Sequence, residues 1–207
     1  MSPLLVLGEG GVRLADAEYL HTAQQLCHQN NALLIFDEVQ CGLGRSGYLW
    51  AHQETGVTPD IMTLAKPLAG GLPIGATLVT EAVAQSMKPS DHGSTFAAGP
   101  LVCRAAQVVF DRVAQPEFLR SVRSTGKYLL ERLRALAPAD IVEVRGAGLL
   151  VGAEFSNSVK PLIDAAADRG LLAISAGENV LRLCPPLVVS TEQVDAVIDI
   201  IADCLSS

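Results

Sequence analysis

Two polar residues, Asp37 and Lys66, each follow a short apolar run of the sequence. The run before Asp37 covers residues 33–36, and the run before Lys66 covers residues 61–65. Short apolar runs between polar or turn residues are typical of buried strands in a parallel sheet. Because ligands bind outside the carboxyl ends of such strands, the sequence predicts a carboxylate and an amine at one edge of a sheet.

The chemistry open to this pair is that of a lysine amine assisted by a carboxylate. Pro67 favours an extended backbone at Lys66, and a partly buried lysine at a strand end presents an amine for Schiff-base chemistry. By itself Lys66 would more often be a surface residue, and Asp37 a solvated turn former. Together they match what pyridoxal phosphate requires, a lysine for its aldehyde and a carboxylate beside its ring nitrogen.

The surrounding sequence predicts the elements that position these two residues in an α/β fold. Apolar residues recur at helical spacing over 16–29, between apolar runs at 4–7 and 33–36, which predicts a right-handed βαβ unit of a parallel sheet. Longer helices are expected over 100–114 and 117–136. Shorter patterns predict strands at 76–79, 141–144, 149–155, 171–174 and 180–184 and helices at 81–87, 159–169 and 191–205.

The last helix and the domain boundary carry two further expectations. Thr191 is a residue type that caps helices, and Glu192 would lie in the first turn. The pattern of strands and helices changes near Pro116, so we expect two domains, residues 1–115 and 116–207.

Composition and charge narrow the class of protein. A formal charge of −7 disfavours nucleic acid and anionic membranes as partners, and no apolar run reaches the roughly 20 residues that cross a bilayer. The first residues lack the features of a signal or transit peptide. The five cysteines are scattered, which is typical of buried thiols in a reducing compartment, and neither they nor the four histidines suggest a metal site. We expect a soluble intracellular protein.

Four longer segments resemble those of one enzyme family. They read FDEVQCGLGRSG (36–47), PDIMTLAKPLAGGLPIGA (59–76), DHGSTFAAGPLVC (91–103) and NVLRLCPPLVVS (179–190). They are similar to the class III (ornithine-type) aminotransferases, most of all to the branch that acts on N-acetylornithine. The likeness runs from Gly8 to about Ala202 and corresponds to the C-terminal half of the family's chain. It implies part of a fold type I large domain with a mostly parallel sheet, followed by a small α+β domain.

The resemblance implies a pyridoxal-phosphate site. Lys66 would bind the aldehyde of the cofactor and, once displaced by the substrate amine, would move the proton during transamination. Asp37 would pair with the ring nitrogen, Val39 would pack on one face of the ring, and Gln40 would bind near the phenolic oxygen. Thr95 would donate to the phosphate across a dimer interface.

The resemblance also implies substrate contacts. Arg182 would hold the substrate α-carboxylate with its planar guanidinium, Glu9 would pair with this arginine between half-reactions, and Ser94 would lie near the substrate. The alternatives are that Arg182 is a solvent-facing charge, Glu9 a turn residue, and Ser94 and Thr95 ordinary loop residues. Structural roles are expected for Arg45, His92 and Arg145.

The implied reaction moves an amino group between N-acetylornithine and 2-oxoglutarate, a step of arginine biosynthesis, in a homodimer. Three alternatives stay open: a truncated, non-catalytic half of such an enzyme, a related enzyme acting on ornithine or 4-aminobutyrate, or a semialdehyde mutase. The family's Gly-rich phosphate loop has no counterpart in this sequence. The expected compartment is the cytoplasm or, in a eukaryote, a mitochondrion or plastid.

Overall fold

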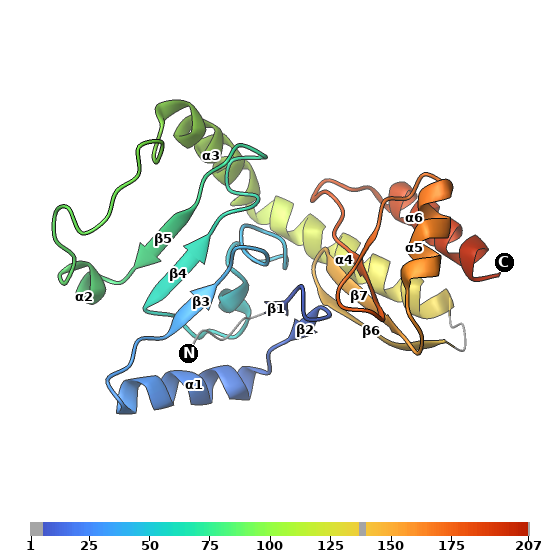
Figure 1. Ribbon diagram of the computed structural model, residues 1–207, viewed down its shortest axis with the longest axis horizontal. Helices are drawn as coiled ribbons and strands as arrows, with labels where there is room; N and C mark the ends of the chain where they lie inside the picture. Colours follow the sequence, from blue (N-terminus) through green and yellow to red (C-terminus); the bar gives the residue numbers. More distant parts are fainter. Residues whose placement is uncertain (1–5, 137–139, 207) are drawn as a thin grey trace. The chain divides into compact units, whose positions relative to one another are not determined.

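The computed structural model describes residues 6–136 and 140–206, which form two compact units (Figure 1). Unit 1 comprises residues 15–44 and 48–118. Unit 2 comprises residues 6–14 and 45–47 together with the described residues from 119 onward. The domain division expected between residues 115 and 116 stays a prediction.

Unit 1 is built on a three-stranded sheet in the order β3-β4-β5. Strand β3 (Ile35–Asp37) runs parallel to β4 (Ile61–Leu64), and β4 runs antiparallel to β5 (Ala76–Val79), as the arrows in Figure 1 show. Phe36 and Met62 are buried partners in the register of β3 and β4. The predicted α/β class is confirmed, with a mixed sheet in this part of the chain.

The helices of unit 1 begin and end where the sequence supplies suitable residues. Helix α1 (Ala17–Gln29) is capped by Asp16, whose side chain accepts a hydrogen bond from the backbone of Glu18 at 2.7 Å. A 3-10 turn, η1 (Ala51–Glu54), follows β3, and α2 (Glu81–Ala84) follows β5. Helix α3 (Pro100–Val113) starts on a proline, which suits the first helical position.

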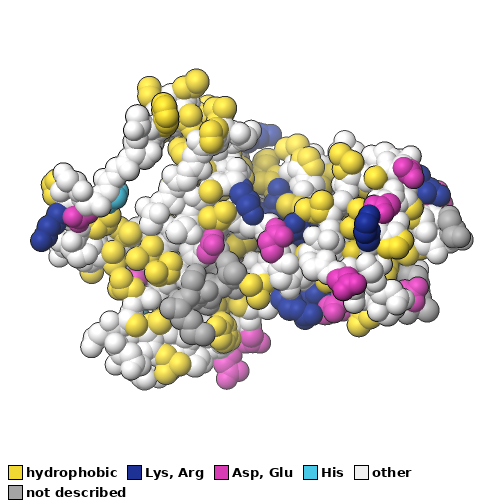
Figure 2. Space-filling view, in the orientation of Figure 1, with side chains coloured by type: hydrophobic (Ala, Val, Ile, Leu, Met, Phe, Trp, Pro, Cys, Tyr) yellow, Lys and Arg dark blue, Asp and Glu magenta, His cyan; other side chains and the backbone are white. Residues whose placement is uncertain are grey.

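Helix α3 leaves much of its apolar surface uncovered. Leu101 is 75% exposed, and Val108, about two helical turns further along, is 56% exposed. Figure 2 shows hydrophobic side chains gathered over this helix.

Unit 2 contains a four-stranded antiparallel sheet in the order β6-β7-β9-β8. Its inner strand β7 is almost wholly buried because both faces are covered. The β1–β2 hairpin covers one face: a Cβ added at Gly152 of β7 would lie 3.0 Å from Val12. The strands are β1 (Val6–Leu7), β2 (Arg13–Leu14), β6 (Ile141–Ala147), β7 (Leu150–Phe155), β8 (Ile174–Ser175) and β9 (Val180–Leu183).

Three helices complete unit 2: α4 (Pro116–Leu136), from residue 119 onward, α5 (Lys160–Asp168) and α6 (Thr191–Leu205). Helix α4 packs very closely on the turn between β6 and β7. A Cβ at Gly126 would overlap the backbone oxygen of Gly148, so residue 126 must be glycine for the two segments to pack this closely.

The expected βαβ unit at the start of the chain is wrong. Val6–Leu7 pairs antiparallel with Arg13–Leu14, because the glycine-rich turn that follows β1 sends the chain straight back. Residues 4 and 5 of the expected strand lie outside the described residues. The two apolar runs therefore do not share one sheet.

Two smaller expectations are also corrected. Most of the strand expected over 171–174 is irregular, and β8 begins only at Ile174. The cap of α6 is Ser190 rather than Thr191: the Ser190 side chain accepts a hydrogen bond from the backbone of Gln193, and Thr191 is the first helical residue. Glu192 lies in the first turn, as predicted.

Candidate functional site

Asp37 and Lys66 lie at the carboxyl ends of two adjacent parallel strands. Asp37 is the last residue of β3 and is the register partner of Thr63 in β4. Lys66 stands two residues beyond the end of β4, in the turn that precedes Ala69. Lys66 is exposed rather than partly buried, because it lies in this turn and not in the strand itself.

The carboxylate of Asp37 is fixed by one of its two oxygens. Oδ1 accepts a hydrogen bond from the backbone of Val39 at 2.9 Å and another from the hydroxyl of Thr63 at 3.3 Å. Among the described residues, no donor binds Oδ2 of Asp37, and Lys66 forms no hydrogen bond or ion pair. One carboxylate oxygen and one amine are thus uncommitted at the same sheet edge.

Thr63 was not among the predicted site residues. The available signal was its place three residues before Lys66 in the second apolar run, where it is the one polar residue. Only the strand register reveals that its hydroxyl faces Asp37.

Glu38 anchors the chain immediately after Asp37. Its side chain is 1% exposed and accepts hydrogen bonds from the backbone of Ala51 at 2.7 Å and of His52 at 3.0 Å. The His52 ring nitrogen Nδ1 lies 2.7 Å from the same carboxylate. A Cβ at Gly42 would lie 2.8 Å from Glu38, so glycine is needed there. This buried anchor, which we did not predict, holds the turn that carries Val39.

The remaining predicted residues of unit 1 differ in their surroundings. Val39 and Gln40 are half-buried in the turn after β3 and therefore lie next to Asp37. Ser94 and Thr95 are exposed in the loop between α2 and α3. Within the described residues, no hydrogen bond or ion pair joins this loop to Asp37.

In unit 2, Arg182 is buried and paired with Glu9. Arg182 is 5% exposed, and its Nη1 donates to Oε1 of Glu9 at 2.6 Å. Its Nε has no hydrogen-bond partner in the described parts of the chain. The solvent-facing alternative for Arg182 is therefore wrong. Glu9 contacts Arg182, the partner that was expected for it.

Arg45 and Arg145 make structural contacts within unit 2, in line with expectation. Arg45 donates to the backbone oxygens of Leu149 at 3.0 Å and Pro185 at 2.5 Å. Burial lowers the pKa of Arg45 below its usual range, and the nearby Cys184 partly opposes this shift. Arg145 donates to the backbone oxygen of Gly11, in the β1–β2 turn, at 2.6 Å.

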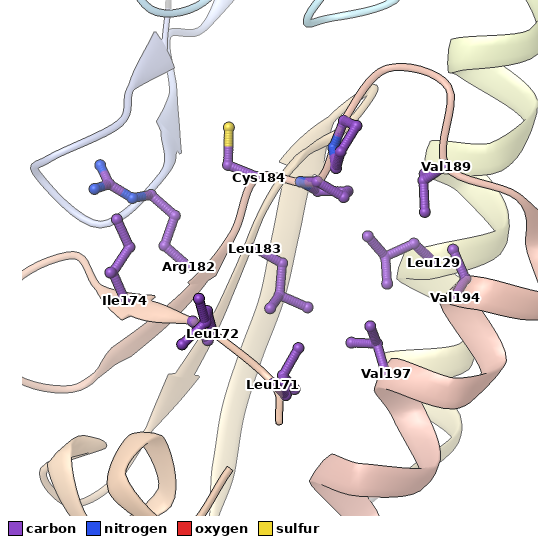
Figure 3. Close-up of a pocket in the computed structure, with 13 residues that line it drawn as sticks. Leu129, Leu171, Leu172, Ile174, Arg182, Leu183, Cys184, Val189, Val194 and Val197 are labelled. Atoms are coloured by element: carbon purple, nitrogen blue, oxygen red, sulfur yellow. The ribbon is translucent and has the colours of Figure 1, made fainter. Parts of the chain in front are cut away.

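A cavity of about 310 Å³ lies among apolar side chains of unit 2. Leu129 of α4 and Val194 of α6 face Leu183 of β9 across it (Figure 3). Figure 3 also shows the guanidinium of Arg182 directed away from these side chains. Arg182 lines the cavity together with these apolar side chains, but its guanidinium is the part that pairs with Glu9.

The cysteines and metal-binding residue types add no further site. Cys41 is buried as expected, but Cys184 is exposed because it follows the end of β9. In the described ranges, no cluster of three or more His, Cys, Asp and Glu residues could hold a metal ion. None of the helices described is both long enough and apolar enough to cross a membrane.

Comparison with known proteins relates the chain to aminotransferases. The class-III aminotransferase family matches residues 3–205. Mitochondrial acetylornithine aminotransferase of Alnus glutinosa is 51% identical over 203 residues, which are 97% of this chain and 45% of that protein. Acetylornithine aminotransferase of Clostridium acetobutylicum is 46% identical over 198 residues, which are 94% of this chain and 51% of that protein.

Solved structures agree with this relationship. N-acetylornithine aminotransferase from Stenotrophomonas maltophilia is 34% identical with a TM-score of 0.89, covering 99% of this chain and 55% of that one. Plasmodium falciparum ornithine δ-aminotransferase is 32% identical with a TM-score of 0.92, covering 99% of this chain and 54% of that one. The chain thus spans about half the length of these relatives. It belongs to the class-III aminotransferases, a family of pyridoxal-phosphate-dependent transaminases.

Proposed function

We propose that this chain carries the catalytic lysine of an aminotransferase that moves an amino group between N-acetylornithine and 2-oxoglutarate. The observation that carries the proposal is the edge of the β3–β4 sheet. Asp37 keeps one oxygen uncommitted there while its other oxygen is held by Val39 and Thr63. Lys66, in the turn after the neighbouring strand β4, has an amine without a partner among the described residues.

These residues fit pyridoxal phosphate, which supplies an aldehyde that condenses with amines and a ring that withdraws electrons. Lys66 would bind the aldehyde and, when its amine is released, move the proton at the substrate α-carbon. Oδ2 of Asp37 would accept a hydrogen bond from the protonated ring nitrogen, which keeps the ring electron-withdrawing. Val39 would pack on the ring, and Gln40 would bind the phenolic oxygen.

Thr95 and Ser94 would complete the site from the loop before α3. Thr95 would donate its hydroxyl to the cofactor phosphate, across the interface of a homodimer, and Ser94 would lie near the substrate. Both hydroxyls are exposed in the described structure and so are accessible to a phosphate or a substrate.

Unit 2 would supply the recognition of the substrate carboxylate. The guanidinium of Arg182 is buried, so an incoming carboxylate would meet it with little competition from water. Glu9 would neutralise the buried cation when no substrate carboxylate is present, which avoids the cost of an unpaired buried charge.

The relatives support N-acetylornithine as the amino donor. Two acetylornithine aminotransferases share 51% and 46% identity with this chain, while that of Aquifex aeolicus and a succinylornithine transaminase of Yersinia pseudotuberculosis each share 42%. Ornithine and 4-aminobutyrate are the other donors to test. The compartment expected from the sequence stays a prediction, and relatives named as mitochondrial are among those matched.

The lysine assignment is tested by reduction with borohydride after addition of pyridoxal phosphate, followed by peptide mapping. We expect one reduced adduct, on Lys66, and none in Lys66→Ala. Lys88 is the matched control, because it is an exposed lysine of the same unit that lies far along the chain from β4. Equal labelling of Lys66 and Lys88 would show unspecific reaction and would refute the proposed site.

Size analysis of the purified chain distinguishes a homodimeric enzyme from a truncated, non-catalytic half. A monodisperse dimer supports the dimeric aminotransferase. Aggregation, or solubility only with a second polypeptide, supports a half that works with a partner.

A further inference from the structure

The turn between β1 and β2 holds Glu9 beside Arg182. The Glu9 side chain is 75% exposed, whereas that of Arg182 is 5% exposed, so packing restrains the glutamate less than it restrains the arginine. The backbone of the turn sets where the side chain of Glu9 begins.

This turn has a backbone conformation that its residues do not favour. Val12 has a φ of 52°, in the left-handed region that β-branched residues rarely adopt. Val12 is 0% exposed and packs against β7, because a Cβ at Gly152 would lie 3.0 Å from Val12. Gly11, the residue before it, has a φ of 96°. Such a turn persists only where the surrounding structure holds it.

Arg145 of β6 is the residue that holds this turn. It is 7% exposed, and its Nε and Nη2 donate to the backbone oxygen of Gly11 at 2.9 and 2.6 Å. Its Nη1 pairs with Glu143 and Glu154. Glu154 also pairs with Arg13 of β2 at 3.2 Å, so the same cluster secures the strand that follows the turn.

We propose that Arg145 is a positioning residue for the Glu9–Arg182 pair. Its guanidinium clamps the Gly11 carbonyl, which keeps Val12 in its disfavoured conformation and Glu9 against the buried cation. Loss of the clamp lets the turn relax and moves Glu9 away, so that Arg182 meets competing carboxylates without its resident partner. Arg145 thereby sets how strongly Glu9 competes with a substrate carboxylate, which rests on the role of Arg182 proposed above.

The first test needs neither cofactor nor substrate. NMR measures hydrogen exchange at Nε–H of Arg182 in the full chain, in wild type, Arg145→Lys and Arg145→Met. Lysine keeps the charge beside Glu154 but lacks the planar fork, and it covers the case in which methionine prevents folding. We expect exchange about tenfold faster in the lysine variant. Arg134→Met is the control, since Arg134 also donates to a backbone oxygen, that of Val144, outside the turn.

The second test distinguishes positioning from general loosening of unit 2. Calorimetry measures 2-oxoglutarate affinity in wild type, R145K, E9Q and the double variant. We expect R145K to raise the affinity for 2-oxoglutarate about threefold when Glu9 is present. In the E9Q background, where residue 9 no longer competes as a carboxylate, R145K should have no effect.

The outcomes separate the two proposals. Unchanged Arg182 exchange in R145K, or an equal change of 2-oxoglutarate affinity in both backgrounds, overturns the positioning role of Arg145. If 2-oxoglutarate binds to none of the four forms, the carboxylate-binding role of Arg182 fails, and the exchange measurement still decides whether Arg145 holds the turn.

Discussion

The hydroxyl of Thr63 is expected to set how tightly this chain holds pyridoxal phosphate. Thr63→Val removes the hydroxyl without changing the shape of the side chain, so Asp37 loses one of the two hydrogen bonds to Oδ1. At 3.3 Å this bond to a carboxylate is long, and we assign it about 1 kcal/mol, below the usual range for bonds to charged groups. Since 1.4 kcal/mol corresponds to a tenfold change, the cofactor should bind about fivefold more weakly.

The assay is titration of the chain with pyridoxal phosphate, followed by absorbance of the bound cofactor. Thr63→Ser keeps the hydroxyl and should restore most of the affinity. Thr77→Val is the control, because Thr77 is the register partner of Thr63 on β5 but is exposed and forms no hydrogen bond with Asp37. Equal affinity of Thr63→Val and wild type would refute the idea that Thr63 orients the carboxylate.

Three further results are expected. Gly126→Ala should destabilise unit 2 by about 3 kcal/mol in urea unfolding, because the methyl group would overlap the backbone of Gly148. Alanine has the higher helix propensity, so propensity alone would predict the opposite sign. A loss below about 0.5 kcal/mol would contradict this packing. The hydrogen bond from Arg145 holds the pKa of Glu154 below its usual range. The ion pair therefore stabilises the folded state above about pH 4, and this stabilisation is lost as the pH falls through the lowered pKa. Glu154→Gln should therefore flatten the acid limb of the stability profile, and an unchanged limb would argue against the ion pair. Ser190→Ala should cost about 1 kcal/mol of helix stability, seen as faster amide exchange in the first turn of α6 and nowhere else.

Local patterns in the sequence were sufficient to predict most elements of the fold. Strand β5 and helix α6 begin and end at the expected residues. Helix α6 does so because it buries one apolar stripe, Val194, Ile198 and Ile201. The β1–β2 hairpin was not predictable in this way, since strands of two residues are too short to show a period. Leu172 explains the error at β8: it is apolar but 90% exposed, so its hydrophobicity did not indicate a buried strand.

The candidate site was predictable only in part, for a related reason. Asp37 and Lys66 were found because each ends an apolar run, a property visible in the sequence. Thr63 was missed, and Arg145 was expected only to have a structural role, because their contacts join distant segments: Thr63 is 26 positions from Asp37, and Arg145 is 134 positions from Gly11. Such contacts depend on strand register and turn geometry, which side-chain periodicity does not encode.

Each unit holds its own charged group with its own residues. In unit 1 the carboxylate of Asp37 is oriented by Thr63, from the next strand of the same sheet. In unit 2 the guanidinium of Arg182 is paired with Glu9, whose turn is clamped by Arg145. A charged group that is already oriented pays little reorganisation energy when cofactor or substrate arrives, which is the main source of electrostatic catalysis. The orientation of these two groups is therefore a local property of each unit, and substitutions at Thr63 and Arg145 should act on different ligands, the first on the cofactor and the second on the substrate carboxylate.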